Sequence, residues 1–287
     1  MDAAIEVKGL TKHYPAFKLE SISFTLPRGG VMGFIGANGA GKTTTIKALL
    51  GLIKINGGSI SLLGGAPTDT QVKRKIGVVL DENSAYDNFS FKQAARVERT
   101  MRLDWDEKLW QSYVESFDLP PRAQIKEYSR GMKMKLFIAL ALAHRPQLLI
   151  LDEPTGGLDP LMREEVLNVF RDFMGDQSHA ILFSSHITSD LDKIASHIAF
   201  IHGGKLVFAK EKAALMEDWG LARCADAEFA SIPDEFILGY RHSSFGYEML
   251  VRDKPRLAAA LPWLALGSAS TEEIMLFYVQ GQRRGGQ

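Results

Sequence analysis

The residues whose types and spacing can do chemistry begin with Gly36 to Thr43, which match G-x-x-x-x-G-K-[ST] at every fixed position. The glycines let backbone N–H groups curl around a phosphate, because a β-carbon there would block its approach. Lys42 can neutralise the β- and γ-phosphates, and the Thr43 hydroxyl can ligate Mg²⁺. The stretch therefore predicts a nucleotide-binding loop with contacts from Gly36, Ala37, Asn38, Gly39, Ala40, Gly41, Lys42, Thr43 and Thr44.

A pair of carboxylates, Asp152 and Glu153, directly follows the apolar run from Gln147 to Leu151. Two acidic side chains at the end of a buried strand are costly unless they serve a cation or a reaction. Beside a phosphate loop, the expected roles are that Asp152 orients Mg²⁺ and Glu153 polarises the water that attacks the γ-phosphate. The alternative is that both carboxylates only cap the strand.

The elements that must position these residues are short apolar strands and the helices between them. Val31 to Ile35 predicts a buried strand, and Thr44 to Leu50 predicts a helix whose N-terminus faces the nucleotide. Further buried strands are expected at Lys75 to Leu80, Ala180 to Phe183 and Ile198 to Ile201. Strands that alternate with helices predict an α/β fold with a mostly parallel sheet and ligands at the carboxyl ends of the strands.

The N-terminal residues alternate between apolar and polar, which predicts strands at Ile5 to Leu10 and Ser21 to Leu26 that form an antiparallel edge. A loop is expected between them, from Thr11 to Pro15. Tyr14 in this loop is a candidate for stacking on an adenine ring. A half-buried aromatic at a strand end is the alternative, and Phe17 stands nearby as a competitor.

Two regions lie outside this strand-and-helix pattern. Residues from about 83 to 145 form a helical insert, with helices expected at Phe91 to Arg102, Asp106 to Phe117 and Tyr128 to His144. Beyond about Lys210 the periodicity weakens and no motif is present. We therefore expect an ATP-binding domain over residues 1–210 and a small accessory module without chemistry over residues 211–287.

Composition limits the class of protein. Hydrophobic residues make up 46% and charged residues 24%, as in soluble globular proteins. The 34 Lys and Arg residues balance the 34 Asp and Glu residues, so nucleic acid is not an expected partner. Cys224 is the single cysteine and is expected to be a buried small hydrophobe. The N-terminus has no signal-peptide pattern, and the apolar run from Leu257 to Leu266 is too short to span a bilayer.

The motifs together resemble those of the ATP-binding subunit of an ABC transporter, in order and spacing across residues 5–210. The matching segments are Gly36 to Thr43 (Walker A), Gln147 to Glu153 (Walker B with the catalytic glutamate), Tyr128 to Met132 (a variant of the LSGGQ signature), Gly157 to Asp159 (D-loop), His186 (switch histidine) and Tyr14 (the adenine-stacking aromatic). The resemblance implies a P-loop NTPase core.

The same resemblance implies an ATPase that uses ATP and Mg²⁺. Lys42, Glu153 and His186 would be catalytic, with Glu153 as general base and His186 in contact with the γ-phosphate. Thr43 and Asp152 would hold Mg²⁺. The residues Ser129, Gly131 and Asp159 would complete the nucleotide site; since Ser129 and Gly131 open a helix, they offer N–H groups to the ATP of a second chain in a head-to-tail homodimer.

The resemblance also implies a polytopic membrane permease as a partner, encoded as a separate chain and of the exporter type. The subunit would then be cytoplasmic and held at the inner face of the cell membrane through this permease. Asp81 to Phe91 is the expected docking surface, because this polar loop opens the helical insert and carries Tyr86 and Phe89.

Two positions depart from the family pattern. Asp81, or Glu82 if the loop shifts by one, stands where the family usually has a glutamine that contacts Mg²⁺ and the attacking water. Arg130 replaces the second glycine of the signature. A regulatory protein with slow turnover is therefore an alternative. A soluble ABC-type ATPase is another, disfavoured because only 93 positions separate Gly36 from Ser129, too few for a long coiled-coil insertion.

Overall fold

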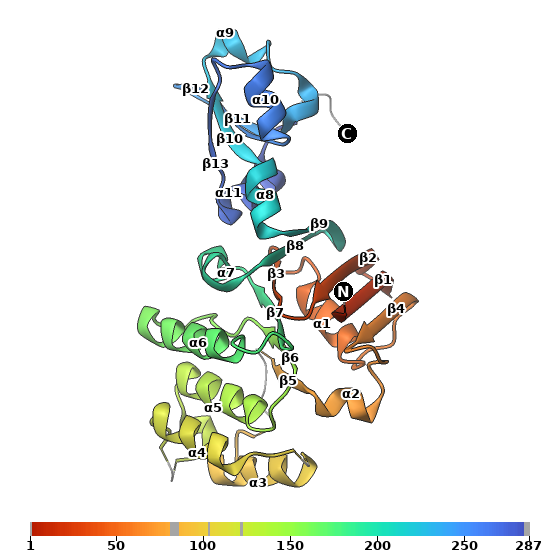
Figure 1. Ribbon diagram of the computed structural model, residues 1–287, viewed down its shortest axis with the longest axis vertical. Helices are drawn as coiled ribbons and strands as arrows, with labels where there is room; N and C mark the ends of the chain where they lie inside the picture. Colours follow the sequence, from red (N-terminus) through yellow and green to blue (C-terminus); the bar gives the residue numbers. More distant parts are fainter. Residues whose placement is uncertain (1, 81–85, 103, 121–122, 284–287) are drawn as a thin grey trace. The chain divides into compact units, whose positions relative to one another are not determined.

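The computed structural model describes residues 2–80, 86–102, 104–120 and 123–283. The chain divides into two compact units, Met1–Ala209 and Lys210–Gln287 (Figure 1). Each unit has a sheet and a hydrophobic core of its own. Among the described residues, none of the helices has the length and apolar character needed to cross a membrane.

The first unit is built on a nine-stranded sheet with the order β4-β1-β2-β9-β8-β3-β7-β6-β5. Its parallel part consists of β3 (Val31–Ile35), β5 (Ile76–Val79), β6 (Leu148–Asp152), β7 (Ala180–Ser185) and β8 (His197–His202). Its antiparallel edge consists of β1 (Ala3–Tyr14), β2 (Phe17–Pro27) and β4 (Gly57–Leu62), and β9 (Lys205–Glu211) joins the two parts beside β2. The predicted fold class is confirmed.

Burial explains the central strands. Every residue of β3, β6 and β7 is buried, as expected for parallel strands that are covered on both faces. The helices α1 (Lys42–Leu49) and α6 (Pro160–Phe173) lie on opposite sides of these strands (Figure 1). Two short helices, α2 (Thr70–Arg74) and α7 (Thr188–Ile194), were not expected from the sequence, because each is shorter than two full turns.

The prediction of a loop from Thr11 to Pro15 is wrong. Strand β1 continues to Tyr14, which pairs with Phe17 at the start of β2, so the connection is only two residues long. Threonine, histidine and tyrosine fit an extended edge strand, and here the backbone N–H of His13 donates to the Asn56 side chain at 2.8 Å. A tight hairpin therefore replaces the loop.

The helical insert contains α3 (Phe91–Met101), α4 (Glu107–Ser116), the 3₁₀ turn η1 (Ile125–Glu127) and α5 (Arg130–Leu142). Helix α5 begins two residues later than expected, because Ser129 is its N-cap and accepts from the Met132 N–H at 3.2 Å. Phe91 is 4% exposed and packs on Trp110 with ring centroids 6.0 Å apart. Phe91 is thus a core residue, which corrects its expected place on a docking surface.

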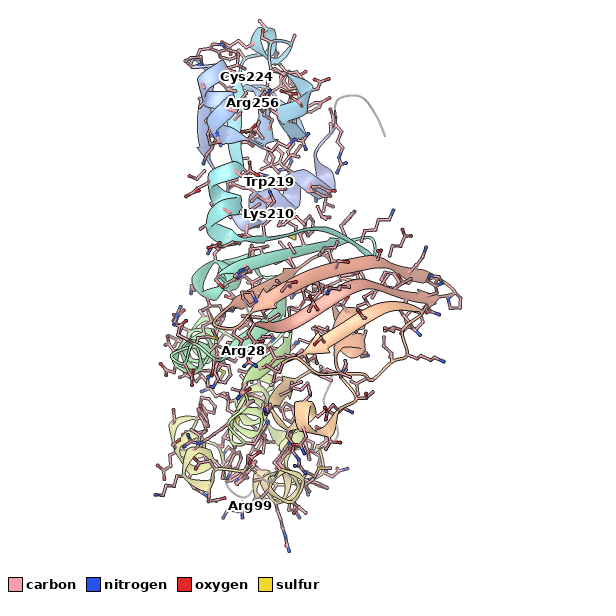
Figure 2. All side chains as sticks on the ribbon, turned by 45° about the vertical axis from the view of Figure 1, so that its right-hand side comes forward. Arg28, Arg99, Lys210, Trp219, Cys224 and Arg256 are labelled. Atoms are coloured by element: carbon pink, nitrogen blue, oxygen red, sulfur yellow. The ribbon has the colours of Figure 1, made fainter. Side chains whose placement is uncertain are left out.

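The second unit has a four-stranded sheet, β11-β12-β10-β13, whose strands pair antiparallel. The strands are β10 (Gly220–Cys224), β11 (Ile237–Ser243), β12 (Gly246–Val251) and β13 (Ala265–Ser268). The helices are α8 (Lys212–Asp218), α9 (Asp226–Phe229), η2 (Asp234–Phe236), α10 (Lys254–Ala260) and α11 (Thr271–Gln280). Cys224 belongs to this unit (Figure 2) and is buried, as predicted.

His144 is a buried histidine in the segment between α5 and β6. It is 2% exposed, and its Nε2 lies 3.2 Å from the carbonyl oxygen of Ile76 on β5. Burial, together with the nearby Arg102 guanidinium, lowers the pKa of His144 to about 4. The folded protein therefore holds this imidazole neutral at pH values where an unfolded chain would protonate it.

We expect the stability of the protein to fall as the pH drops from about 6.5 to about 4, because only the unfolded chain takes up a proton on this histidine in that window. The contribution of His144 is at most about 3 kcal/mol. His144→Gln should flatten this part of the pH profile in urea unfolding experiments. His202→Gln, at an exposed histidine, is the control and should leave the profile unchanged.

Candidate active site

The phosphate loop connects β3 to α1, and its backbone demands glycine at three places. Gly39 and Gly41 have φ values of 77° and 115°, in the left-handed region that favours glycine. A Cβ on Gly36 would lie 2.4 Å from the carbonyl oxygen of Ile201. The loop therefore needs glycine at two places for its left-handed backbone and at one place for close packing against β8.

Lys42 is the buried cation of this loop. Its side chain is 6% exposed, and its Nζ donates to the carbonyl oxygen of Gly36 at 2.8 Å. The same Nζ lies 3.2 Å from Oε1 of Glu153. The structure thus brings together two of the residues predicted to be catalytic.

Glu153 occupies a strained backbone position at the end of β6. Its φ is 52°, rare for a residue with a side chain, and its N–H donates to the carbonyl oxygen of Ser184 at 3.1 Å. Its second carboxylate oxygen, Oε2, lies 2.7 Å from Nδ1 of His186 and accepts from the His186 backbone N–H at 3.3 Å. Glu153 therefore lies between Lys42 and His186, with one oxygen on each.

Asp152 is held by two hydroxyl groups. The Thr43 hydroxyl donates to Oδ2 at 2.8 Å, and the Ser184 hydroxyl donates to Oδ1 at 2.5 Å. Asp152 is 2% exposed. A hydroxyl and a carboxylate oxygen that meet beside a phosphate loop are hard oxygen donors, so Thr43 and Asp152 fit Mg²⁺. Sequence reasoning missed Ser184, although it lies at the end of a buried strand next to β6.

A hollow of about 570 Å³ lies over the phosphate loop. It is lined by Phe17, Ala37, Asn38, Gly39, Gly41, Lys42, Thr43, Thr44 and Glu153. Tyr14 is not among these lining residues; it is 43% exposed, and the Nζ of Lys12 lies 4.9 Å from its ring centre. Phe17 packs so closely that a Cβ on Gly41 would lie 3.0 Å from its ring. The nearer aromatic is thus Phe17.

The signature residues lie outside this hollow. Ser129 is exposed at the start of α5, whereas Gly131 is buried, and a Cβ on it would overlap the sulfur of Met162 on α6. The Arg130 side chain runs along the loop after Glu153, because a Cβ on Gly157 would lie 3.1 Å from its Nη1. The signature thus packs against the D-loop segment.

Asp159 also lies outside the hollow. It is the N-cap of α6, and its Oδ1 accepts from the N–H groups of Leu161 and Met162 at 3.0 Å each. The predicted metal ligand Asp81 lies outside the described residues. The structure therefore unites Lys42, Thr43, Asp152, Glu153 and His186 with the phosphate loop, and places the signature and Asp159 elsewhere.

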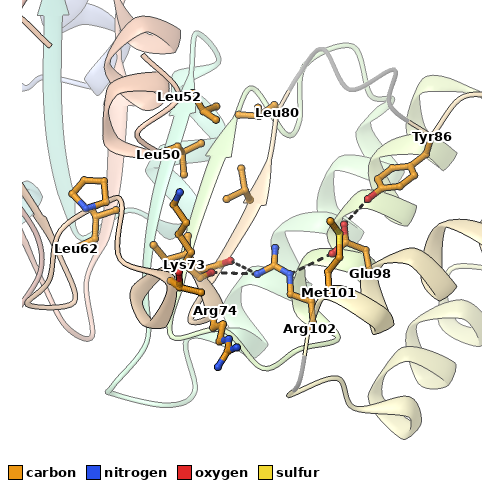
Figure 3. Close-up of a pocket in the computed structure, with 14 residues that line it drawn as sticks. Leu50, Leu52, Leu62, Lys73, Arg74, Leu80, Tyr86, Glu98, Met101 and Arg102 are labelled. Atoms are coloured by element: carbon orange, nitrogen blue, oxygen red, sulfur yellow. Dashed lines mark hydrogen bonds and ion pairs between the residues drawn. The ribbon is translucent and has the colours of Figure 1, made fainter. Parts of the chain in front are cut away.

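A second hollow of about 590 Å³ lies between the core and the helical insert (Figure 3). It is lined by Leu50, Leu52, Leu62, Pro67, Thr70, Lys73, Arg74, Ile76, Val78, Leu80, Tyr86, Glu98, Met101 and Arg102. The Tyr86 hydroxyl donates to Glu98 at 2.6 Å, and Arg102 pairs with the other oxygen of Glu98 at 3.3 Å. Burial and this hydrogen bond raise the pKa of Tyr86. Sequence reasoning missed this hollow, because its lining comes from distant segments.

Comparisons with known proteins agree with this geometry. Residues 19–156 match the family described as "ABC transporter". The chain is 34% identical over 212 residues to the bacitracin transport ATP-binding protein BcrA of Bacillus licheniformis, which covers 72% of this chain and 69% of that protein. It is 36% identical over 210 residues to the lantibiotic transport ATP-binding protein SrtF of Streptococcus pyogenes, which covers 72% of this chain and 90% of that one.

The fold is also similar to a solved structure. An ATP-binding subunit of an ABC transporter superposes with a TM-score of 0.68 and 27% sequence identity. The superposition covers 75% of this chain and 92% of that chain.

Exchanges of the two aromatic residues should separate their roles. If Tyr14 stacks on the adenine, as the family resemblance implies, Tyr14→Ala should raise the Kd for ATP at least about fivefold with little loss of stability, since base stacking contributes about 1–3 kcal/mol and the ring is half exposed. Phe17→Ala should lower thermal stability as well, because its ring packs on Gly41. Titration with a fluorescent ATP analogue and thermal melting measure both quantities. Unchanged affinity in Tyr14→Ala, with a loss in Phe17→Ala, would assign adenine stacking to Phe17.

Proposed function

Because this chain belongs to the ABC transporter family, whose ATP-binding subunits are ATPases that power transport, we propose that it hydrolyses Mg-ATP to drive a separate membrane permease of the exporter type. The observation that carries the proposal is the position of Glu153 between Lys42 and His186, at the edge of the phosphate hollow. The transport functions in the names of the relatives support the exporter type.

The nucleotide would change the partner of Lys42. In the structure, Nζ of Lys42 is paired with Oε1 of Glu153 at 3.2 Å. Phosphate oxygens in the loop would attract the Lys42 ammonium and release this carboxylate oxygen. Glu153 can then accept a proton from a water molecule.

The reaction is an in-line displacement at the γ-phosphorus. The water oxygen forms a bond to the γ-phosphorus, its proton passes to Glu153, and the bond to the β-γ bridging oxygen breaks with its electrons on ADP. His186 holds the other oxygen of Glu153 and orients the carboxylate. When bound, Mg²⁺ held by Thr43 and Asp152 would neutralise charge on the β- and γ-phosphates.

The signature motif supports a dimer. Ser129 is exposed at the N-terminus of α5 and does not line the hollow of its own chain. The N–H groups at this 13-residue helix can bind an anion. We therefore propose that Ser129 and Gly131 bind the γ-phosphate of ATP held by a second copy, with Asp159 at the same interface. Residues 211–287 would take no part in this chemistry, and no nucleic acid is involved.

The second hollow is our proposed docking site for the permease. Leucine, isoleucine and valine side chains contribute to its lining, and two of the lining residues, Leu52 and Met101, are 60% and 68% exposed. Lys73 and Arg74 add positive charge to its lining, whereas the charge of Arg102 is offset by Glu98. A short amphipathic helix with one acidic side chain matches this chemistry. Tyr86 belongs both to the docking segment expected from the sequence and to this lining. The proposed docking site therefore keeps Tyr86 and adds residues of the core.

Glu153→Gln should retain ATP binding, lose most of the turnover and accumulate as a homodimer with ATP. Glutamine keeps the volume of the side chain but cannot accept a proton, and a general base contributes about 10²–10⁴-fold to the rate. Size-exclusion chromatography with ATP and with ADP measures the dimer, which should need ATP. Adding Ser129→Arg should abolish the dimer while the monomer still binds ATP. A monomer with bound ATP in the single variant would refute the head-to-tail dimer.

Cysteines at Leu52 and Met101, in a Cys224→Ala background, should form crosslinks to a cytoplasmic segment of the permease in membranes. These residues line the second hollow, and Cys224 is the only native cysteine. Phe245→Cys is the control, because Phe245 is 95% exposed and lies in the second unit. Crosslinks from Phe245→Cys at a yield equal to or above that of the two hollow positions would place the permease elsewhere.

A further inference from the structure

A buried ion pair joins the two helices that follow the catalytic segments. Asp190 on α7 is 1% exposed, and its Oδ2 lies 3.7 Å from Nε of Arg163 on α6. Neither of these two buried atoms has a hydrogen-bond partner among the described residues. A buried carboxylate needs a cation nearby, but this pair is too long for a hydrogen bond. The contact between these two atoms is therefore an attraction between opposite charges without a hydrogen bond.

Each member of the pair is tied to a segment that carries a catalytic residue. Nη2 of Arg163 donates to the carbonyl oxygen of Leu158 at 3.3 Å, and Leu158 lies in the loop that follows Glu153. Asp190 lies four residues after His186 in the chain, in the first turn of α7. The pair therefore bridges the loop of Glu153 and the segment of His186, whose side chains meet at 2.7 Å.

The alternative is that the pair only holds α6 against α7. A different ion pair already does so at the surface, where Glu164 of α6 lies 2.6 Å from Lys193 of α7. Among the described residues, neither Glu164 nor Lys193 makes a hydrogen bond to the loop after Glu153. This surface pair thus provides a matched control, since it joins the same two helices without reaching the catalytic loop.

We propose that Arg163 and Asp190 are positioning residues for hydrolysis. By linking the Leu158 carbonyl to α7, they fix the separation of the two segments and keep His186 against Glu153. Neither residue is among those that line the hollow over the phosphate loop. The inference rests on the proposed function, because it assigns the contact of Glu153 and His186 to the chemical step.

The test compares kcat, KM and the Kd for ATP in the full-length protein. Asp190→Asn keeps the shape but removes the charge, and it should lower kcat by about tenfold to a hundredfold, the range for a small misplacement of a catalytic group. The Kd for ATP and KM should change less than about twofold, because the phosphate loop is untouched. Arg163→Lys keeps the charge but loses the planar fork that reaches both partners, and it should lower kcat in the same way. Glu164→Gln should leave kcat unchanged.

The outcomes separate the possibilities. A kcat loss in both variants, with Kd retained, supports the positioning role. Three results would overturn it. The first is a kcat that is retained in the folded variants, and the second is an equal loss of kcat in Glu164→Gln. The third is a loss of ATP affinity as large as the loss of kcat. If Asp190→Asn does not fold, Arg163→Lys decides, and failure of both to fold would show a purely structural pair. A wild-type protein that binds ATP without turnover would refute the proposed function, and with it this inference.

Discussion

The ion pair between Lys42 and Glu153 is the interaction on which the site depends. The two charged groups lie 3.2 Å apart, and their side chains are only 6% and 14% exposed. Charges so buried are tolerated when they are paired, and leaving one without its partner costs about 3–5 kcal/mol. The pair therefore requires the N-terminus of α1 and the end of β6 to lie at one place, which is a constraint on the whole sheet.

Three neighbouring strands satisfy this constraint. Strand β7 lies between β3 and β6 in the sheet, and all three end at the same edge. Ser184 on β7 accepts a hydrogen bond from the Glu153 N–H at its carbonyl oxygen, and its hydroxyl donates to Asp152. His186 follows two residues later in the chain. Ligand sites at the carboxyl ends of parallel strands arise for this reason, since adjacent strands bring distant parts of the chain together there.

The helical insert is attached to this same region through the signature. Gly131 allows α5 to pack against Met162 of α6, and Arg130 lies along Gly157. The segment that would serve a second chain's ATP therefore rests on the loop that follows Glu153. A shift of either one must displace the other, because close-packed groups move together. In the proposed head-to-tail dimer, this contact would give a physical route by which one nucleotide site senses the other.

The sequence by itself determined the family, the fold class and the place of the phosphate loop between a strand and a helix. These features depend on neighbours along the chain, such as the glycine spacing of Gly36 to Thr43 and the apolar run of β6. Local patterns did not predict the N-terminal hairpin, because the pairing of Tyr14 with Phe17 decided its conformation. They also did not predict β10 and β13 in the second unit, because strands this short carry little periodicity.

Only the tertiary structure decided which side chains meet. Ser184 on Asp152, Phe17 beside Gly41 and the pair of Arg163 with Asp190 each join segments that are far apart or on different elements. Strand order, and not residue spacing, sets these contacts, because a parallel sheet places side by side strands that may be separated by more than a hundred residues in the chain, as β3 and β7 are.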